Sequence, residues 1–429
     1  MGKTLEGEGN RSKIIKPLRI VPYDLGWEAL DAAQGVEVSE NIRVAMRKYK
    51  PVKPPLITEP VAGFFVYSYQ ICDTQNNELN LVANIFTSGI CVFTFWDSPY
   101  QIQDKRFAVD YCHSRASSHR DISNGLHPLC KPMVAIVETL TACGPSSPES
   151  EPNESLEKTC SCALYTMTIT FILNDMDSRT YTEMDDDEKR NLQIILEPSI
   201  AHEEDSSMHL LEFDNTDPYD FDLSRLSPPV DLLKSNAASI FATWAAVVVV
   251  IPNSTCNNLY GLDGLMIGLE VLLQEIWSYI WLKKTKMNSY ESDNVPITTI
   301  RSEEARLDLR LSGYSNNCDV NLPIYVRDIQ TRLVETSGLY EERNEYVQYA
   351  DNVVRNIEAR HAEQQRIDAE KQLKYSRQNQ LLLYLIAIIQ IAPFLYELFS
   401  GQYLTVELGP LVAVICTIII GGIITIRSE

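Results

Sequence analysis

The sequence predicts an α+β (α/β) cytoplasmic domain followed by a long helix or helical hairpin and two C-terminal transmembrane helices. Three observations indicate this fold class. Aromatic and β-branched segments bounded by turn residues occupy much of the first half of the chain. Residues 322–380 contain almost no helix-breaking residue, and residues 381–399 and 404–426 form two apolar stretches. Each stretch is close to the roughly 20 residues that a membrane-spanning helix needs.

These features divide the chain into four parts. We expect an N-terminal arm over residues 1–55, which contains a short helix near residues 39–48. A cytoplasmic α/β domain is expected over residues 56–300, a long helical stalk over residues 301–378, and a two-helix transmembrane hairpin over residues 379–429.

Strands are predicted where β-branched and aromatic residues gather between turn residues. The segments are residues 64–71, 90–96, 133–142, 160–173 and 192–197. In residues 160–173 threonines alternate with larger apolar residues, a pattern that predicts one solvated face and one buried face.

After Pro229 the pattern becomes mainly helical. Residues 230–243 are expected to form a helix. Residues 244–251 (WAAVVVVI) are too short and too β-branched for a membrane span, so we expect a fully buried strand. Residues 265–284 are apolar almost all round, which favours a helix packed against a sheet or a subunit. The polar exceptions in that helix are Glu270, Gln274 and Glu275.

The stalk carries a seven-residue repeat of apolar positions. Ser302 is expected to cap a helix. Beyond it the repeat predicts a coiled-coil seam or a helix packed in a bundle. The repeated residues are Leu333, Tyr340, Val347 and Val354. Gly338 is expected to break the stalk into a helical hairpin, whose second arm enters the first membrane span without interruption.

The two apolar stretches are predicted to form a hairpin in the lipid bilayer. They are separated by a four-residue outer turn, which consists of Ser400, Gly401, Gln402 and Tyr403. Inside lipid every backbone polar group must be paired within the segment, so two helices are expected. Basic residues flank the stretches only on the other side, at Lys371, Lys374, Arg377 and Arg427. The positive-inside rule therefore predicts an integral membrane protein whose termini and main domain are cytoplasmic.

A polar stripe follows one face of the predicted long helix into the bilayer. Steps of seven, eleven and eighteen residues return to nearly the same face of a helix with 3.6 residues per turn. The residues on this face are His361, Asp368, Gln372, Asn379, Gln390 and Glu397. Polar groups at membrane depth are costly and normally face a bundle interior or a water-filled path. Two interpretations stay open. In the first, Asp368, Gln372, Asn379, Gln390 and Glu397 line a pore. In the second, the polar residues within the bilayer form hydrogen bonds between packed helices.

The chain is strongly acidic, with a formal net charge of −21. This charge argues against direct nucleic-acid binding, because nucleic-acid binders present basic faces. The acidity is concentrated in residues 149–157, 183–188 and 203–222, which are expected to be solvated loops or a divalent-cation sensor. The candidate metal ligands are Asp185, Asp186 and Asp187. No phosphate-binding, dinucleotide or hydrolase motif occurs, so an enzyme is not expected.

This layout resembles the CorA-like divalent-cation channels, which join an α/β domain to a long helix, a short outer turn and a second span. The resemblance covers mainly residues 230–429. It implies a funnel-shaped homo-oligomer, a pentamer or tetramer, whose long helix lines a path for Mg²⁺ or another divalent cation. The family's Gly-Met-Asn signature is absent, and Phe399-Ser400-Gly401-Gln402 stands in its place. This departure puts Mg²⁺ selectivity in doubt.

Two further resemblances lead to different functions. CorA-like proteins without the signature also occur as membrane effectors of antiviral defence, including type III CRISPR loci. There a nucleotide messenger binds the cytoplasmic domain, which implies a ligand-gated effector. The candidate cofactors that stay open are Mg²⁺ or another divalent cation, and a nucleotide messenger. Residues 85–97 (IFTSGICVFTFWD), followed by a helical hairpin and a membrane segment, are similar to a family whose mitochondrial members are needed for translation or meiotic division. That resemblance implies a non-conducting, membrane-anchored scaffold.

Overall fold

The computed structural model describes most of the chain. The described residues are 14–27, 32–52, 66–72, 78–102, 107–144, 167–174, 179–196, 228–234, 238–243, 246–252, 262–290, 295–316 and 324–399, with single residues 415, 417 and 421. The chain divides into two compact units, Met1–Ala350 and Asp351–Glu429.

The first unit contains a mixed sheet of ten described strands, in which β6 pairs with β1 and the others follow the order β2-β3-β4-β5-β1-β7-β10-β9-β8. Neighbours in this sheet pair antiparallel except β7 and β10, which are parallel. The strands are β1 (Ile14–Asp24), β2 (Lys50–Val52), β3 (Val66–Cys72), β4 (Glu78–Phe86), β5 (Ile90–Trp96), β6 (Tyr100–Gln101), β7 (Met167–Asn174), β8 (Val230–Lys234), β9 (Ser239–Ala242) and β10 (Ala246–Pro252).

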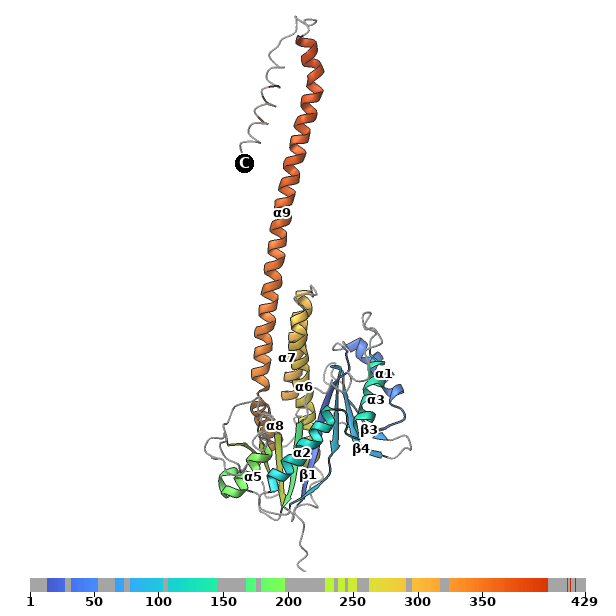
Figure 1. Cartoon of the computed structure of the whole chain (residues 1–429), viewed down its shortest axis with the longest axis vertical. Helices are drawn as coiled ribbons and strands as arrows, with labels where there is room; N and C mark the ends of the chain where they lie inside the picture. The colour runs from blue at the N-terminus through green and yellow to red at the C-terminus, as the bar shows by residue number, and fades with distance from the viewer. Residues whose placement is uncertain are drawn as a thin grey trace, which may run out of the picture. The chain divides into compact units, whose positions relative to one another are not determined.

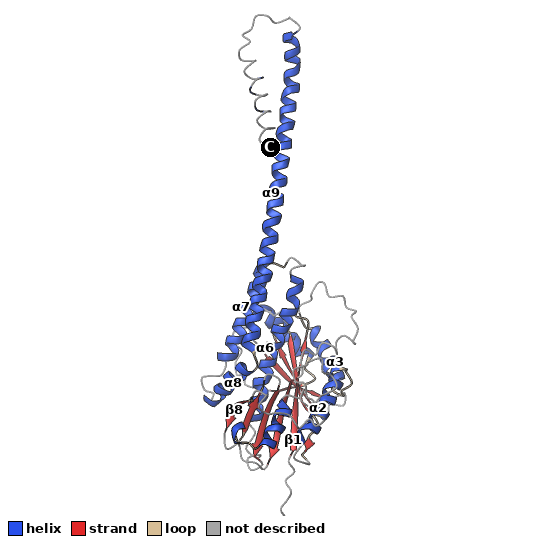
Figure 2. Cartoon of the chain, turned by 60° about the vertical axis from the view of Figure 1, so that its left-hand side comes forward, coloured by secondary structure: helices blue, strands red, loops and turns tan. Residues whose placement is uncertain are grey.

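Helices lie on both faces of this sheet. The described helices of the chain are α1 (Ala32–Ala45), α2 (Phe107–Ser123), α3 (Cys130–Thr141), the 3₁₀ helix η1 (Tyr181–Glu183), α5 (Asp186–Leu196), α6 (Leu262–Tyr290), α7 (Ile297–Asn316), α8 (Ile324–Thr336) and α9 (Leu339–Phe399). The apolar side chains of α1 and α3 pack on one face of β3, β4 and β5. Helices α2 and α5 cover the same face of the sheet at β1, β7 and β10, and Figure 1 shows α2 and α3 in front of the strands. Helix α6 lies on the opposite face, so the strands form the middle of three layers (Figure 2).

The central strands are buried on both faces, which explains their unbroken apolar runs. Val247, Val248 and Val249 of β10 have no exposed surface. The predicted buried strand is therefore confirmed for residues 246–251, and residues 244 and 245 lie outside the described residues. Helix α6 is also confirmed as a helix packed against the sheet, since Gln274 reaches Met167 of β7 at 2.9 Å. Strand β1 lies near the middle of the sheet, so residues 14–24 of the expected arm belong to the central layer.

Two predicted strands are wrong, because both segments are helices. Residues 133–142 lie in α3, and residues 192–197 overlap the last turns of α5. The buried residues of α3 include Met133, Val134, Val137 and Leu140. Their spacing of three and four residues belongs to one helix face, and the run of β-branched residues had hidden it.

Three other predictions for this domain need correction. The helix expected at residues 230–243 is the hairpin of β8 and β9, because β9 pairs with the buried strand β10. The described part of the alternating segment, residues 167–173, has no solvated threonine face, since Thr168 and Thr170 are fully buried and Thr170 meets Tyr111 of α2; residues 160–166 lie outside the described residues. Ser302 lies inside α7, which begins at Ile297.

The predicted break of the stalk at Gly338 is confirmed, since α8 ends at Thr336 and α9 begins at Leu339. Gly338 separates α8 from α9 and adopts a φ of 68°, a left-handed conformation that favours glycine at the end of a helix. The predicted seam is right at Leu333 and Val354, which are buried, but wrong at Tyr340, which is 45% exposed while its neighbour Leu339 is buried. The residues of α9 that are buried are Leu339, Tyr346, Ala350, Val353, Val354 and Ile357. The break at Gly338 resets the helical phase, so a repeat counted across it is shifted.

Candidate functional site

The predicted pore-lining residues all lie on helix α9. They are Asp368, Gln372, Asn379, Gln390 and Glu397. On a helix with 3.6 residues per turn they fall within an arc of about 40°. The side chains of the first four are exposed. Polar positions therefore recur on one face of α9, with the apolar Ile386 on the same face between Asn379 and Gln390, and the helix continues past Pro393 without a break.

An apolar segment of α9 follows Gln380, and its large side chains are exposed in every direction round the helix. Seven of them between positions 381 and 389 have exposed fractions from 43% to 69%. They are Leu381, Leu382, Leu383, Leu385, Ile386, Ile388 and Ile389. A helix that is hydrophobic all round is normally buried in a protein or in lipid. An exposed apolar surface of this extent indicates a site of contact with lipid or another chain.

Tyr384 lies close to a residue of the second apolar stretch. A Cβ atom placed on Gly421 would stand 3.2 Å from the hydroxyl oxygen of Tyr384. Ile415, Thr417 and Gly421 are helical. Tyr384 and Gly421 are equally distant along the chain from the junction between Gln402 and Tyr403. Their proximity is the arrangement expected when two helices run antiparallel from a turn at that point.

The remaining predicted site residues are those of the outer turn, the acidic segments and the candidate metal ligands. Ser400, Gly401 and Gln402 lie outside the described residues, as do the acidic residues 149–157 and 203–222. Asp185, Asp186 and Asp187 are exposed at the start of α5. Asp185 accepts a hydrogen bond from the backbone of Glu188 at 2.8 Å, which is a helix-capping contact. Within the described ranges, no group of three or more His, Cys, Asp or Glu side chains is arranged to hold a metal ion.

The structure adds a buried charge network between α6 and α7. Arg310 of α7 donates a hydrogen bond to Glu275 of α6, and its guanidinium lies 4.3 Å from the ring centroid of Tyr279. Lys283 pairs with Glu303 in the same way, and Tyr290 donates to that carboxylate at 3.0 Å. Burial raises the pKa of Glu275, although Arg310 opposes the rise.

Glu270 belongs to the same helix but has no partner for either carboxylate oxygen among the described residues. It is fully buried, and burial raises its pKa to about 8. Sequence reasoning had marked Glu270 and Glu275 only as polar exceptions in an apolar helix. Their position in an apolar helix was the sequence feature that could have indicated a buried charged site, because a buried carboxylate needs either a partner or a proton.

Comparisons of the chain with protein-family models, curated proteins and solved structures found no match. Among the described helices, one stretch has the length and hydropathy of a membrane span, residues Gly264–Met287 of α6. Its most apolar window is 78% buried inside the protein, as a core helix would be.

Proposed function

We propose that the chain is a CorA-like membrane channel, whose C-terminal hairpin forms a cation path in a symmetric homo-oligomer. The observation that carries this proposal is the exposed apolar segment of α9. Fully burying one leucine or isoleucine is worth about 1.5–3 kcal/mol. Seven such side chains in water would therefore cost on the order of 10 kcal/mol, a penalty that lipid removes.

The polar stripe supports a channel over a plain anchor. Gln390 and Glu397 lie within the apolar part of α9, where a polar group normally faces a bundle interior or a water-filled path. In a ring of parallel α9 helices, Glu397 would form an acidic ring, which concentrates cations. Asn379 and Gln390 would present neutral oxygens and amides to a hydrated ion.

Several features of the CorA-like resemblance are part of the same proposal. The oligomer is a pentamer or tetramer, the α/β domain and both termini are cytoplasmic, and the transported ion is Mg²⁺ or another divalent cation. The chain lacks Gly-Met-Asn at the outer turn, so selectivity for Mg²⁺ does not follow from the resemblance. A nucleotide messenger acting on the α/β domain, as in defence effectors, is the gating ligand that the analogy suggests.

The membrane assignment is tested by thiol labelling of the full chain in cells. A cysteine at Gly401 should react with an impermeant reagent added outside, because the turn should face outward. A cysteine at Ser428 is the matched control and should react only after the membrane is opened. The parent chain, with its ten native cysteines, gives the background. Labelling of Gly401→Cys only after permeabilisation would overturn the orientation.

The channel assignment is tested separately with purified protein in liposomes. A channel should release a cation gradient and should have the mass of several chains in detergent. The scaffold alternative predicts neither property. One chain per micelle with no flux would favour the membrane-anchored scaffold and refute the channel.

A further inference from the structure

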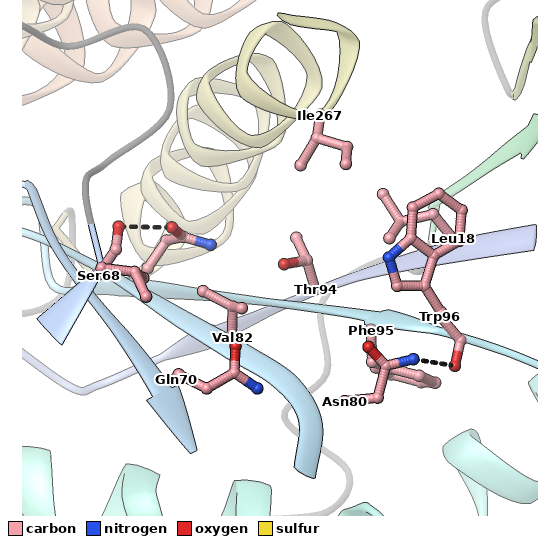
Figure 3. Close-up of a pocket in the computed structure, with 11 residues that line it drawn as sticks. Leu18, Ser68, Gln70, Asn80, Val82, Thr94, Phe95, Trp96 and Ile267 are labelled. Atoms are coloured by element: carbon pink, nitrogen blue, oxygen red, sulfur yellow. Dashed lines mark hydrogen bonds between the residues drawn. The ribbon is translucent and has the colours of Figure 1, made fainter. Parts of the chain in front are cut away.

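A cavity of about 280 Å³ lies on the face of the sheet opposite α1 and α3. Strands β2 to β5 and β1 form its floor, and Ile267 of α6 closes one side (Figure 3). Sheet side chains alternate between faces, so this floor is built from the residues between those of the apolar core. They include Ser68, Gln70, Asn80 and Thr94.

The polar character of this floor is unusual for a buried sheet face. Ser68, Asn84 and Thr94 are each at most 5% exposed, yet all three are polar. The strand register sets Ser68 opposite Asn84, and Val82 opposite Thr94, so the polar groups lie on adjacent strands. Ser68 donates a hydrogen bond to Asn84 Oδ1 at 2.7 Å, and Asn84 donates to the carbonyl oxygen of Val92 at 3.1 Å, so these two buried groups are paired within the sheet. Gln70 is half-buried and Asn80 is exposed, and these two amides are the polar groups that a ligand in the cavity would meet.

The amide groups are oriented by hydrogen bonds within the sheet. Asn80 donates through Nδ2 to the carbonyl oxygen of Trp96 at 3.2 Å, and Gln70 donates to the carbonyl of Leu79 (Figure 3 shows the first). Each amide nitrogen therefore uses one of its two N–H groups in the sheet, which fixes the orientation of the amide. Within the described part of the chain, no donor bonds the side-chain oxygen of either amide. These two oxygens are acceptors that a ligand with N–H or O–H groups would satisfy.

The remaining lining sets the size and charge of the ligand. Leu18, Val82 and Ile267 provide apolar contact, and the Trp96 side chain adds an aromatic ring (Figure 3). None of the described lining residues is ionisable. A phosphate or carboxylate group would therefore lose its hydration without gaining a cationic partner, which is costly. The cavity suits a neutral molecule of about the size of one or two rings.

We propose that this cavity binds a small uncharged ring compound that donates hydrogen bonds to Asn80 and Gln70, such as a monosaccharide or a nucleobase-bearing nucleoside. This inference does not depend on the membrane function, because its readout is binding to the α/β domain.

The test uses ligand-observed NMR and calorimetry with the purified full chain. The neutral probes are glucose, adenosine and thymidine, and the charged counterparts are glucose 6-phosphate, adenosine monophosphate and thymidine monophosphate. At least one neutral probe should bind saturably with a Kd below about 1 mM, and its phosphate should bind at least about tenfold more weakly. A preference for glucose or for a nucleoside distinguishes the two sources.

Substitutions of the lining residues test whether a ligand binds in this cavity. Asn80→Ala and Gln70→Leu each remove one acceptor and should weaken binding about tenfold, the usual effect of losing one hydrogen bond. Val82→Phe should fill the cavity and abolish binding. Asn124→Ala, at an exposed asparagine on another part of the domain, is the matched control and should leave Kd unchanged. Melting temperatures show whether each variant is folded.

Three results would overturn the proposal. The first is no binding of any neutral probe at about 10 mM, a concentration that detects even millimolar affinity. The second is equally tight binding of a phosphorylated counterpart. The third is an unchanged Kd in folded Asn80→Ala and Val82→Phe proteins.

Discussion

Arg310 of α7 forms an ion pair with Glu275 of α6, and the carboxylate has no solvent exposure. The second carboxylate oxygen of Glu275 has no hydrogen-bond partner among the described residues. The pair therefore connects two helices through a single carboxylate oxygen. A buried ion pair as a whole contributes little net free energy to folding. Removing one partner is strongly destabilising, because the other charge stays buried without compensation.

The first prediction concerns this ion pair. Arg310→Met should lower the free energy of unfolding by about 3–5 kcal/mol, because Glu275 then stays buried without its partner. The double variant Arg310→Met with Glu275→Gln should recover much of that loss. Denaturant unfolding followed by tryptophan fluorescence measures both. Arg366→Met removes an exposed pair with Glu363 and should leave stability unchanged. A double variant as unstable as Arg310→Met would show that packing, rather than the charge, determines the loss.

The second prediction concerns the pH dependence caused by Glu270. Its pKa is raised from 4.5 to about 8 by burial, so the folded protein keeps a proton that the unfolded chain releases in this interval. Stability should therefore fall as the pH rises from about 4.5 to 8 and should change little from this residue beyond that range. Glu270→Gln should remove this part of the slope and raise the melting temperature at pH 8.

The control for that experiment is Glu358→Gln, at an exposed position on α9. It should keep the parent's dependence of melting temperature on pH. If Glu270→Gln and the parent lose stability in parallel between pH 5 and 8, Glu270 has a partner that neutralises it.

The third prediction concerns the close approach of Tyr384 and Gly421. Gly421→Ile should disturb this contact, because even a Cβ atom would stand 3.2 Å from the tyrosine hydroxyl oxygen. Oligomer stability in detergent, measured by size-exclusion chromatography with light scattering, should decrease. Tyr384→Ala combined with Gly421→Ile should restore it by making space. Failure of the second change to compensate would mean that the two residues do not meet in the assembled protein.

The fourth prediction concerns the polar stripe of α9. Glu397→Gln should lower cation flux or cation preference in liposomes without changing the oligomer's mass, since an acidic ring concentrates cations. Gln390→Leu should close or dehydrate the path. Glu407→Gln, in the second apolar stretch, is the matched control for loss of a carboxylate. Parental flux in both stripe variants, together with a less stable oligomer, would assign the stripe to helix packing.

Local sequence patterns were reliable where one feature dominated a long segment. The uninterrupted helical pattern predicted α9, and Gly338 was correctly expected to separate it from the preceding helix α8. Residues 244–251 and 265–284 were recognised as buried because they are apolar without a solvated side.

Sequence by itself determined the helical stalk, the buried strand β10 and the apolar helix α6, because their signals are contained within each segment. Only the tertiary structure decided that residues 133–142 are a helix and that Thr168 and Thr170 are buried, since both depend on what covers them. It also decided the partner of Glu275, which lies 35 residues away in sequence. The polar cavity required both strand register and α6. Contacts between distant segments are set by pairing and packing, and composition within one segment cannot specify them.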